Sequence, residues 1–233
     1  LYGRLPDRIW LRPFTLLECE TYAERLGLSM SRQDICEAYM IFGGVPYYWN
    51  LLRPDMSLAQ NIDALFFSQH GALRDEFRFL YESLFRNATE HIHIVEALSK
   101  KKSGMTRDEI AAAANQKPGG NFKIRLEELE QCDFIRKYLL PGRKNRGAVF
   151  QLMDNFTLFH YAFASVHDEG DEHRWSSSQS SQRIAAWRGL SFERVCLQHV
   201  DSIKKALGIS GVRTSAYSWR TAAAADGGGA PID

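Results

Sequence analysis

The side chains best suited to chemistry in this chain are basic ones that cluster near the middle of the sequence. They are Lys100, Lys101, Lys102, Lys123, Arg125, Arg143, Lys144 and Arg146. Lysine and arginine neutralise the phosphates of nucleic acids, so we expect these side chains to contact double-stranded DNA. The alternative is a structural or protein-docking role, because the glutamates at positions 127, 128 and 130 would repel DNA.

Helices and a hairpin would have to position these cations. Hydrophobic spacing predicts helices over residues 91–99, 107–114 and 121–132. The two segments that follow, 134–140 and 148–152, are predicted to be strands. Thr106, followed three residues later by Glu109, predicts a capping box at the start of the second helix. Three helices followed by a hairpin with a basic tip are typical of a winged helix-turn-helix, whose recognition helix enters the major groove.

A second group of residues, Gly43, Gly44 and Pro46, has special backbone properties. Glycine ends helices in the left-handed conformation, and proline suits the first turn of the next helix. The sequence therefore predicts a helix from Ser31 to about Ile41 and another over 46–52, joined by a tight, exposed corner. Such a corner can press against an adenine ring, or it can be an ordinary turn between helices.

The remaining segments are predicted to be mainly helical. Helices are expected over 16–26, 58–67, 73–85 and about 155–166, and a strand over 212–219. Leu190 to Leu207 reads as an amphipathic helix with one apolar side: Phe192, Val195, Cys196, His199, Val200 and Ile203. The polar stretch from Asp168 to Gln182 reads as a linker or mobile loop. The expected fold class is mainly α with small β elements (α+β).

Composition excludes few functions. The chain has 233 residues, 29 basic and 28 acidic, so its net charge of +1 argues neither for nor against nucleic acid. No apolar run is long enough to cross a membrane, and no signal peptide is visible. We therefore expect a cytoplasmic protein without a membrane partner. Isolated cysteines predict free thiols and no metal site: Cys19, Cys36, Cys132 and Cys196.

The order of these motifs resembles the C-terminal two-thirds of a prokaryotic AAA+/STAND-type ATPase of the "archaeal ATPase" family. The matching segments are Leu1–Arg4, Leu11–Phe14, Phe42–Tyr48, Asn61–Ile62, the winged helix, Tyr138 with Gln151–Asp154, and Phe192–Cys196. The resemblance implies an end of the ATPase core and helical lid over 1–88 and a winged-helix domain over 89–167. It implies a linker and partial PD-(D/E)XK-like nuclease domain, with an α/β fold, over 168–233.

The same resemblance implies the cofactors and partners. The parent protein would bind and hydrolyse ATP with Mg²⁺, with Gly43, Gly44 and Pro46 against the adenine and Arg4 near the γ-phosphate. Because this chain has no G-x-x-x-x-G-K-[ST] loop, we expect no cofactor, metal ligand or turnover in the chain itself. Its partners would be the parent's ATPase core and either double-stranded DNA or another protein.

Glu193 and Asp233 are the candidate catalytic carboxylates, since the resemblance places them at the opening of a nuclease fold that holds Mg²⁺. The E-x-K step of that fold does not follow in this sequence, and a lone glutamate on an amphipathic helix is usually solvated. Because the chain begins with Leu1, we expect a piece of a longer protein. The expected function is to couple the nucleotide state of the ATPase core to a partner; the alternatives are a stand-alone winged-helix DNA-binding regulator and a nuclease domain.

Overall fold

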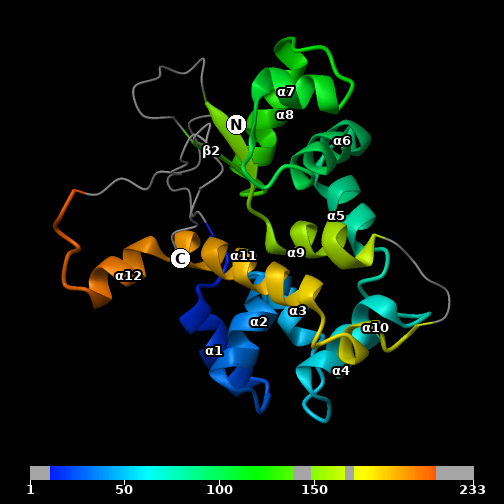
Figure 1. The fold of residues 1–233 in the computed structure, drawn as a ribbon, viewed down its shortest axis with the longest axis vertical. Helices are drawn as coiled ribbons and strands as arrows, with labels where there is room; N and C mark the ends of the chain where they lie inside the picture. Colours follow the sequence, from blue (N-terminus) through cyan, green and yellow to red (C-terminus); the bar gives the residue numbers. More distant parts are fainter. Residues whose placement is uncertain (1–10, 139–147, 166–170, 214–233) are drawn as a thin grey trace, which may run out of the picture.

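The computed structural model describes residues 11–138, 148–165 and 171–213, and every structural statement below concerns these residues. The chain is mainly helical with a small antiparallel sheet (Figure 1). The first half contains α1 (Leu16–Arg25), α2 (Arg32–Phe42), α3 (Pro46–Asn50), α4 (Leu58–Ile62), the π-helical turn η1 (Asp63–Phe67) and α5 (Glu76–Leu84). The middle contains α6 (Ala88–Ser99), β1 (Met105–Thr106), α7 (Arg107–Ala113), α8 (Gly120–Gln131), β2 (Ile135–Tyr138) and β3 (Val149–Leu152). The last part contains α9 (Asn155–Phe159), the π-helical turn η3 (His160–Ala164), α10 (Arg174–Ser177), α11 (Gln182–Gln198) and α12 (Val200–Ala206).

Local capping explains where many helices begin. Capping boxes are formed at α1 by Thr15 with Glu18 and at α7 by Thr106 with Glu109, and the second confirms the prediction. Similar boxes start α2 and α4. Because each box joins residues only three positions apart, the sequence alone fixes these starts.

The sheet has the order β1-β3-β2, and both pairings are antiparallel. Tyr138 pairs with Val149 and Ile135 with Leu152, so β2 and β3 form the expected hairpin. The two-residue strand β1 pairs Met105 with Phe150 and was not predicted, because two residues show no alternation. The predicted turn at 141–147 lies outside the described residues.

The helices after the sheet return to those of the first half. Helix α9 packs on α2, α10 packs on α4 and η1, and α11 packs on α2. Figure 1 shows α11 crossing the middle of the molecule, with α1–α4 on one side and α6–α8 on the other. We call α1–α5 together with α9–α11 the helical frame, and residues 88–152 the sheet segment. The chain leaves the frame, forms the sheet segment and comes back.

The polar stretch after residue 170 is part of this frame and not a loose linker. The Asp63 carboxylate accepts hydrogen bonds from the backbone N–H groups of Trp175 (2.7 Å) and Ser176 (3.1 Å). Trp175 is only 1% exposed and packs edge-on against Phe159. A partner more than a hundred residues away therefore orders α10, and nothing in the local sequence indicates it.

The predicted helix over 190–207 is divided into two. Helix α11 begins earlier, where the Ser181 side chain accepts from the Ile184 N–H, and His199 separates it from α12. The His199 Nε2 accepts a hydrogen bond of 2.9 Å from the Leu16 N–H. Phe192 is 51% exposed, so it does not share a buried side with Val195.

The strand predicted near the C-terminus does not begin within the described residues. Val212 and Arg213 are not in a strand, and the rest of the strand predicted over 212–219 lies outside the described residues. Within the described part, no helix has both the length and the apolar character needed to span a membrane.

Candidate functional site

Helix α8 is the element on which the predicted nucleic-acid contacts depend. Its buried side consists of Phe122, Leu126 and Leu129, in agreement with the helix that hydrophobic spacing predicts over 121–132. The opposite side carries exposed residues: Asn121, Lys123, Ile124 and Glu127. Burial of one side fixes the helix against α6 and β2, so the other side is presented to solvent.

The N-terminus of α8 has no side-chain cap. Gly119 is the N-cap residue, and the first helical bond runs from the Lys123 N–H to the Gly119 carbonyl. The backbone N–H groups of residues 120–122 find no acceptor among the described residues. The Arg107 guanidinium donates to the carbonyls of Pro118 (2.9 Å) and Gly119 (3.0 Å), which holds the preceding turn in place. Free N–H groups at a helix start attract anions such as phosphate.

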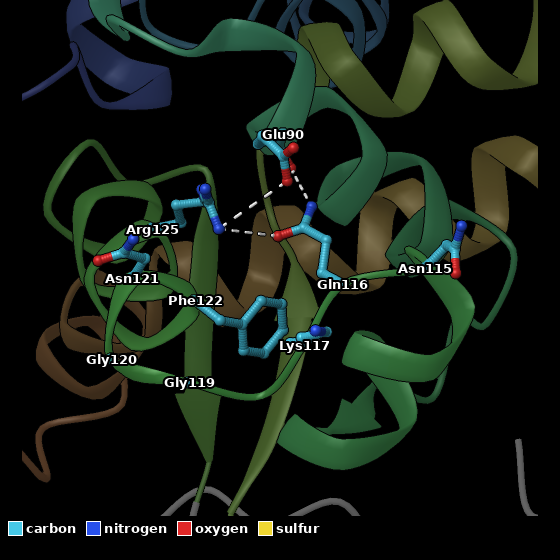
Figure 2. A pocket seen from close by; sticks show the side chains of 9 residues that line it. All are labelled: Glu90, Asn115, Gln116, Lys117, Gly119, Gly120, Asn121, Phe122 and Arg125. Atoms are coloured by element: carbon cyan, nitrogen blue, oxygen red, sulfur yellow. Dashed lines mark hydrogen bonds and ion pairs between the residues drawn. The ribbon is translucent and has the colours of Figure 1, made fainter.

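A shallow hollow of about 460 Å³ lies beside this helix start. Figure 2 shows Arg125 directed toward Glu90 and Gln116. The Gln116 Nε2 donates to the Glu90 carbonyl at 2.7 Å, and its Oε1 accepts from the Arg125 Nη1 at 3.2 Å. The same Nη1 lies 3.8 Å from the Glu90 carboxylate. Arg125 therefore joins α8 to α6 and does not project from the surface.

Three of the lysines predicted to contact DNA are paired with glutamates. The ion pairs are Lys100–Glu96 (2.9 Å), Lys101–Glu109 (2.7 Å) and Lys123–Glu127 (3.3 Å). The hydrogen bond from Lys101, together with those from Thr106, lowers the pKa of the Glu109 carboxyl to about 2. Exposed ion pairs of this kind contribute little to stability, so a ligand could displace one partner. The positive and negative charges of each pair nevertheless largely cancel.

The other predicted cations divide into two groups. Lys102 is exposed and has no ion-pair partner within the described ranges. Arg143, Lys144 and Arg146, at the predicted tip of the hairpin, lie outside the described residues. The positive charge of the hairpin tip therefore stays a prediction from the sequence.

One glutamate of α8 faces the neighbouring helix. The Glu128 carboxylate lies 2.8 Å from the His91 Nε2, and the other ring nitrogen of His91 lies 3.1 Å from the Asn87 carbonyl. His91 is 3% exposed and stacks on Phe85. Glu128 thus helps to fix α8 on α6.

The glycine corner at Gly43 and Gly44 is covered, although an exposed corner was expected. Gly43 ends α2 with φ 60° and ψ −156°, and its carbonyl accepts from the Trp49 Nε1 at 2.9 Å. Gly44 is buried: its carbonyl accepts from the Phe14 N–H at 2.8 Å, and a Cβ there would lie 1.9 Å from the Phe14 carbonyl oxygen. Pro46 is the first residue of α3, as predicted. The exposed part of the corner is formed by Val45 and Tyr47, which are 37% and 53% exposed.

Asn155 connects this corner to the sheet segment and was not predicted. Its Nδ2 donates to the Tyr39 carbonyl at 2.8 Å, and its side chain lies 3.8 Å from the position of a Cβ on Gly43. The next residue, Phe156, stacks on Tyr48 with ring centroids 4.9 Å apart. In the sequence, Asp154 and Asn155 signal only a helix start: Asp154 caps α9 through the Thr157 N–H, whereas the partner of Asn155 lies more than a hundred residues away.

The predicted catalytic carboxylates do not form a site in the described part of the chain. Glu193 is exposed on α11. Asp233 and Arg4 lie outside the described residues. Among the described residues, no group of histidine, cysteine, aspartate and glutamate could hold a metal ion, and the four cysteines are free thiols.

Comparisons with models of known protein families, with curated proteins and with solved structures find no match to this chain.

Proposed function

We propose that this chain is the partner-binding region of a prokaryotic AAA+/STAND-type ATPase, and that it relays the nucleotide state of the P-loop core to a bound partner. In this proposal the sheet segment is a winged helix-turn-helix. Its order of helix, strand, two helices and two strands, with a β1-β3-β2 sheet, supports that assignment. Helix α8 occupies the place of the recognition helix.

The observation that carries the relay is the contact of Asn155 with the glycine corner. Asn155 begins α9 directly after β3, and its amide bonds to the Tyr39 carbonyl in the last turn of α2. The Tyr81 hydroxyl also hydrogen-bonds to Thr157 at 3.0 Å, which ties α9 to α5. A displacement of the corner must break the bond between Asn155 and Tyr39 or move α9, and with it the end of β3. Buried polar contacts of this kind transmit a shift because they are costly to leave unpaired.

The covered corner refines how a nucleotide would bind. Gly44 does not fit a contact with adenine, because the Phe14 backbone already occupies its face. Val45 and Tyr47 supply an exposed apolar and aromatic surface next to it, and an aromatic ring can stack on a base. ATP and Mg²⁺ would be held by the parent's P-loop core, and the corner would respond to the occupied state.

The exposed side of α8 favours a protein partner. It carries one lysine and one glutamate, which pair with each other, and Ile124, which is 51% exposed. Protein interfaces combine apolar residues with a polar rim, whereas DNA requires unpaired positive charge. We therefore propose protein docking through α8 as the output of the relay.

Hydrogen exchange in the full-length product of the gene tests the relay. We expect ATP to change exchange rates in α8, and Asn155→Ala to retain ATP binding but lose this response. Asn50→Ala is the matched control, because Asn50 is an exposed amide at the end of α3 whose side-chain oxygen accepts from the Tyr22 hydroxyl. The proposal fails if the protein binds no ATP in calorimetry, or if Asn155→Ala responds like the control.

A stand-alone DNA-binding regulator is the second candidate function, and the open N-terminus of α8 favours it. Its free N–H groups lie beside the exposed Lys117 and Lys123. We expect duplex binding that weakens at least tenfold between about 50 and about 200 mM salt.

Fluorescence anisotropy with a labelled duplex measures this binding. Alanine at Arg143, Lys144 and Arg146 together should weaken it about tenfold or more. Alanine at Arg32, Lys204 and Lys205 removes the same number of charges elsewhere and should change it little. Salt-independent or undetectable binding removes this candidate.

A further inference from the structure

A second cavity, of about 470 Å³, lies where the end of α6 meets η3 and α11. Its walls are mainly apolar, with Leu158 and Tyr161 on one side and Trp187 and Leu190 on the other. A volume of this size is within the range of small-molecule sites. The cavity joins the sheet segment to the helical frame, and it is separate from both the α8 surface and the glycine corner.

The cavity contains a buried cation, and one of its hydrogen-bond donors has no partner among the described residues. Arg194 lines it and is 7% exposed, and its Nε has no hydrogen-bond acceptor. Burial lowers the pKa of Arg194, and the charge of the neighbouring Glu193 opposes this shift; arginine stays ionised in proteins. A buried donor is costly unless it is hydrogen-bonded, so the Arg194 Nε calls for an acceptor that the described residues do not provide.

A second unpaired donor belongs to the same wall. Trp187 also lines the cavity, and its buried Nε1–H has no acceptor. Buried polar groups in native proteins are rarely unsatisfied, and each exception requires an explanation. Two such donors on α11, both in residues that line one cavity, point to a ligand that accepts hydrogen bonds.

The charges at the cavity favour an anion. Lys100 and Lys102 join Arg194 in its lining, against the single carboxylate of Glu96. Glu96 is already paired with Lys100 at 2.9 Å. Lys102 and Arg194 are therefore left to balance a negative group.

We propose that this cavity binds a small molecule with an aromatic or apolar body and one anionic head, either a carboxylate or a phosphate. The body packs on Tyr161 and Trp187, and the head pairs with Arg194 and Lys102. Since the ligand contacts both the end of α6 and α11, it fastens the sheet segment to the helical frame. This inference is independent of the proposed function and concerns a different surface.

Calorimetric titration with three naphthalene probes tests the site. We expect saturable one-to-one binding of 2-naphthoate or 2-naphthyl phosphate, and the tighter of the two identifies the chemistry of the head. The neutral 2-naphthalenemethanol should bind about tenfold more weakly or worse, because it cannot pair with arginine. No saturable binding of either anion, or equal binding of the alcohol, overturns the proposal.

Variants locate the binding. Arg194→Met should weaken binding of the anionic probe about tenfold or more, since hydrogen bonds to charged groups are among the stronger ones. Lys102→Gln should weaken binding by a smaller factor. Because Lys102 is exposed, this variant should fold and still test the site if Arg194→Met does not fold. The matched control is Lys123→Gln, which removes an exposed lysine of α8 that does not line the cavity. This variant should bind the anionic probe as tightly as the original chain does. An equal loss in Lys102→Gln and Lys123→Gln would mean nonspecific attraction and would overturn the proposed site.

Discussion

Two glycine pairs separate helices in this chain, and their surroundings are opposite. Gly43 and Gly44 lie between α2 and α3 in the helical frame, where the Phe14 backbone and Asn155 cover them. Gly119 and Gly120 lie at the start of α8 in the sheet segment, and a Cβ on either would meet nothing within 4 Å. The first pair is closed by packing, and the second is open to solvent.

The difference shows what glycine does in each place. At Gly43 the backbone itself requires glycine, because φ 60° with ψ −156° is a region that other residues avoid. At Gly44 the close approach of Phe14 requires it. Neither reason applies to Gly119 or Gly120 within the described residues, so neither position requires glycine on steric or backbone grounds.

The largest expected effect comes from filling the closed pair. Gly44→Ala places a methyl group 1.9 Å from the Phe14 carbonyl oxygen, so the free energy of unfolding should fall by about 3 kcal/mol. Urea denaturation measures it. Gly120→Ala is the matched control and should be neutral or stabilising by up to about 1 kcal/mol. Equal effects of the two variants would refute the contrast.

Gly43→Ala separates backbone strain from crowding. The nearest atoms to a Cβ at Gly43 lie 3.8 Å away on Asn155, which is an ordinary contact. Strain at this φ and ψ alone should cost about 1–3 kcal/mol, less than Gly44→Ala. The same urea measurement checks it, and a loss below about 0.5 kcal/mol would mean that the corner relaxes easily.

The start of α7 provides a pH-dependent comparison with the uncapped start of α8. The pKa of Glu109 is lowered to about 2 from its usual 4.5. Its ionised form therefore stabilises the fold above about pH 4.5, and this stabilisation is lost as the pH falls toward 2. Because Glu109 is exposed, we expect Glu109→Gln to cost only about 0.5–1 kcal/mol at pH 7.

Urea titrations of the Glu109→Gln variant at pH 7 and pH 3 check this prediction. The difference from the original chain should shrink at the lower pH. Glu127→Gln removes an exposed pair without a cap and should show a smaller difference at pH 7. A cost of Glu109→Gln that does not change with pH would contradict the assigned cause.

The smallest expected effect comes from capping the open pair. Gly119 has an extended backbone that serine also adopts, and its side chain would accept from the free N–H groups of α8. Gly119→Ser should raise the free energy of unfolding by about 0.3 kcal/mol. Thermal or urea unfolding measures the change, and a destabilising result would mean that the turn tolerates no side chain.

The sequence predicted the elements more reliably than their surroundings. It located the helix starts at Thr15 and Thr106, because each start depends on residues three positions apart. It missed β1, which exists only through its pairing with β3. It also missed the break at His199, because the Leu16 N–H that bonds to the ring lies at the other end of the chain.

The candidate site shows the same division. Lys123 and Arg125 have equal charge in the sequence, yet one is exposed and the other is held between Gln116 and Glu90. Their positions on the helix differ by about half a turn, and only the packing of α8 decides which side is buried. Asn155 and Arg194 could not be found from the sequence, because the contacts that make them important join distant segments.

The sequence by itself determined the helical composition, the capped helix starts, the hairpin pairing and the places where glycine interrupts a helix. These follow from hydrogen bonds and side-chain periodicity between near neighbours in the chain. The tertiary structure alone decided that the first glycine corner is closed, that the polar stretch around Trp175 is ordered by Asp63, and that the Arg194 Nε is buried with no acceptor among the described residues. Each of these depends on atoms brought together across long separations, where packing and burial, not local preference, set the free energy.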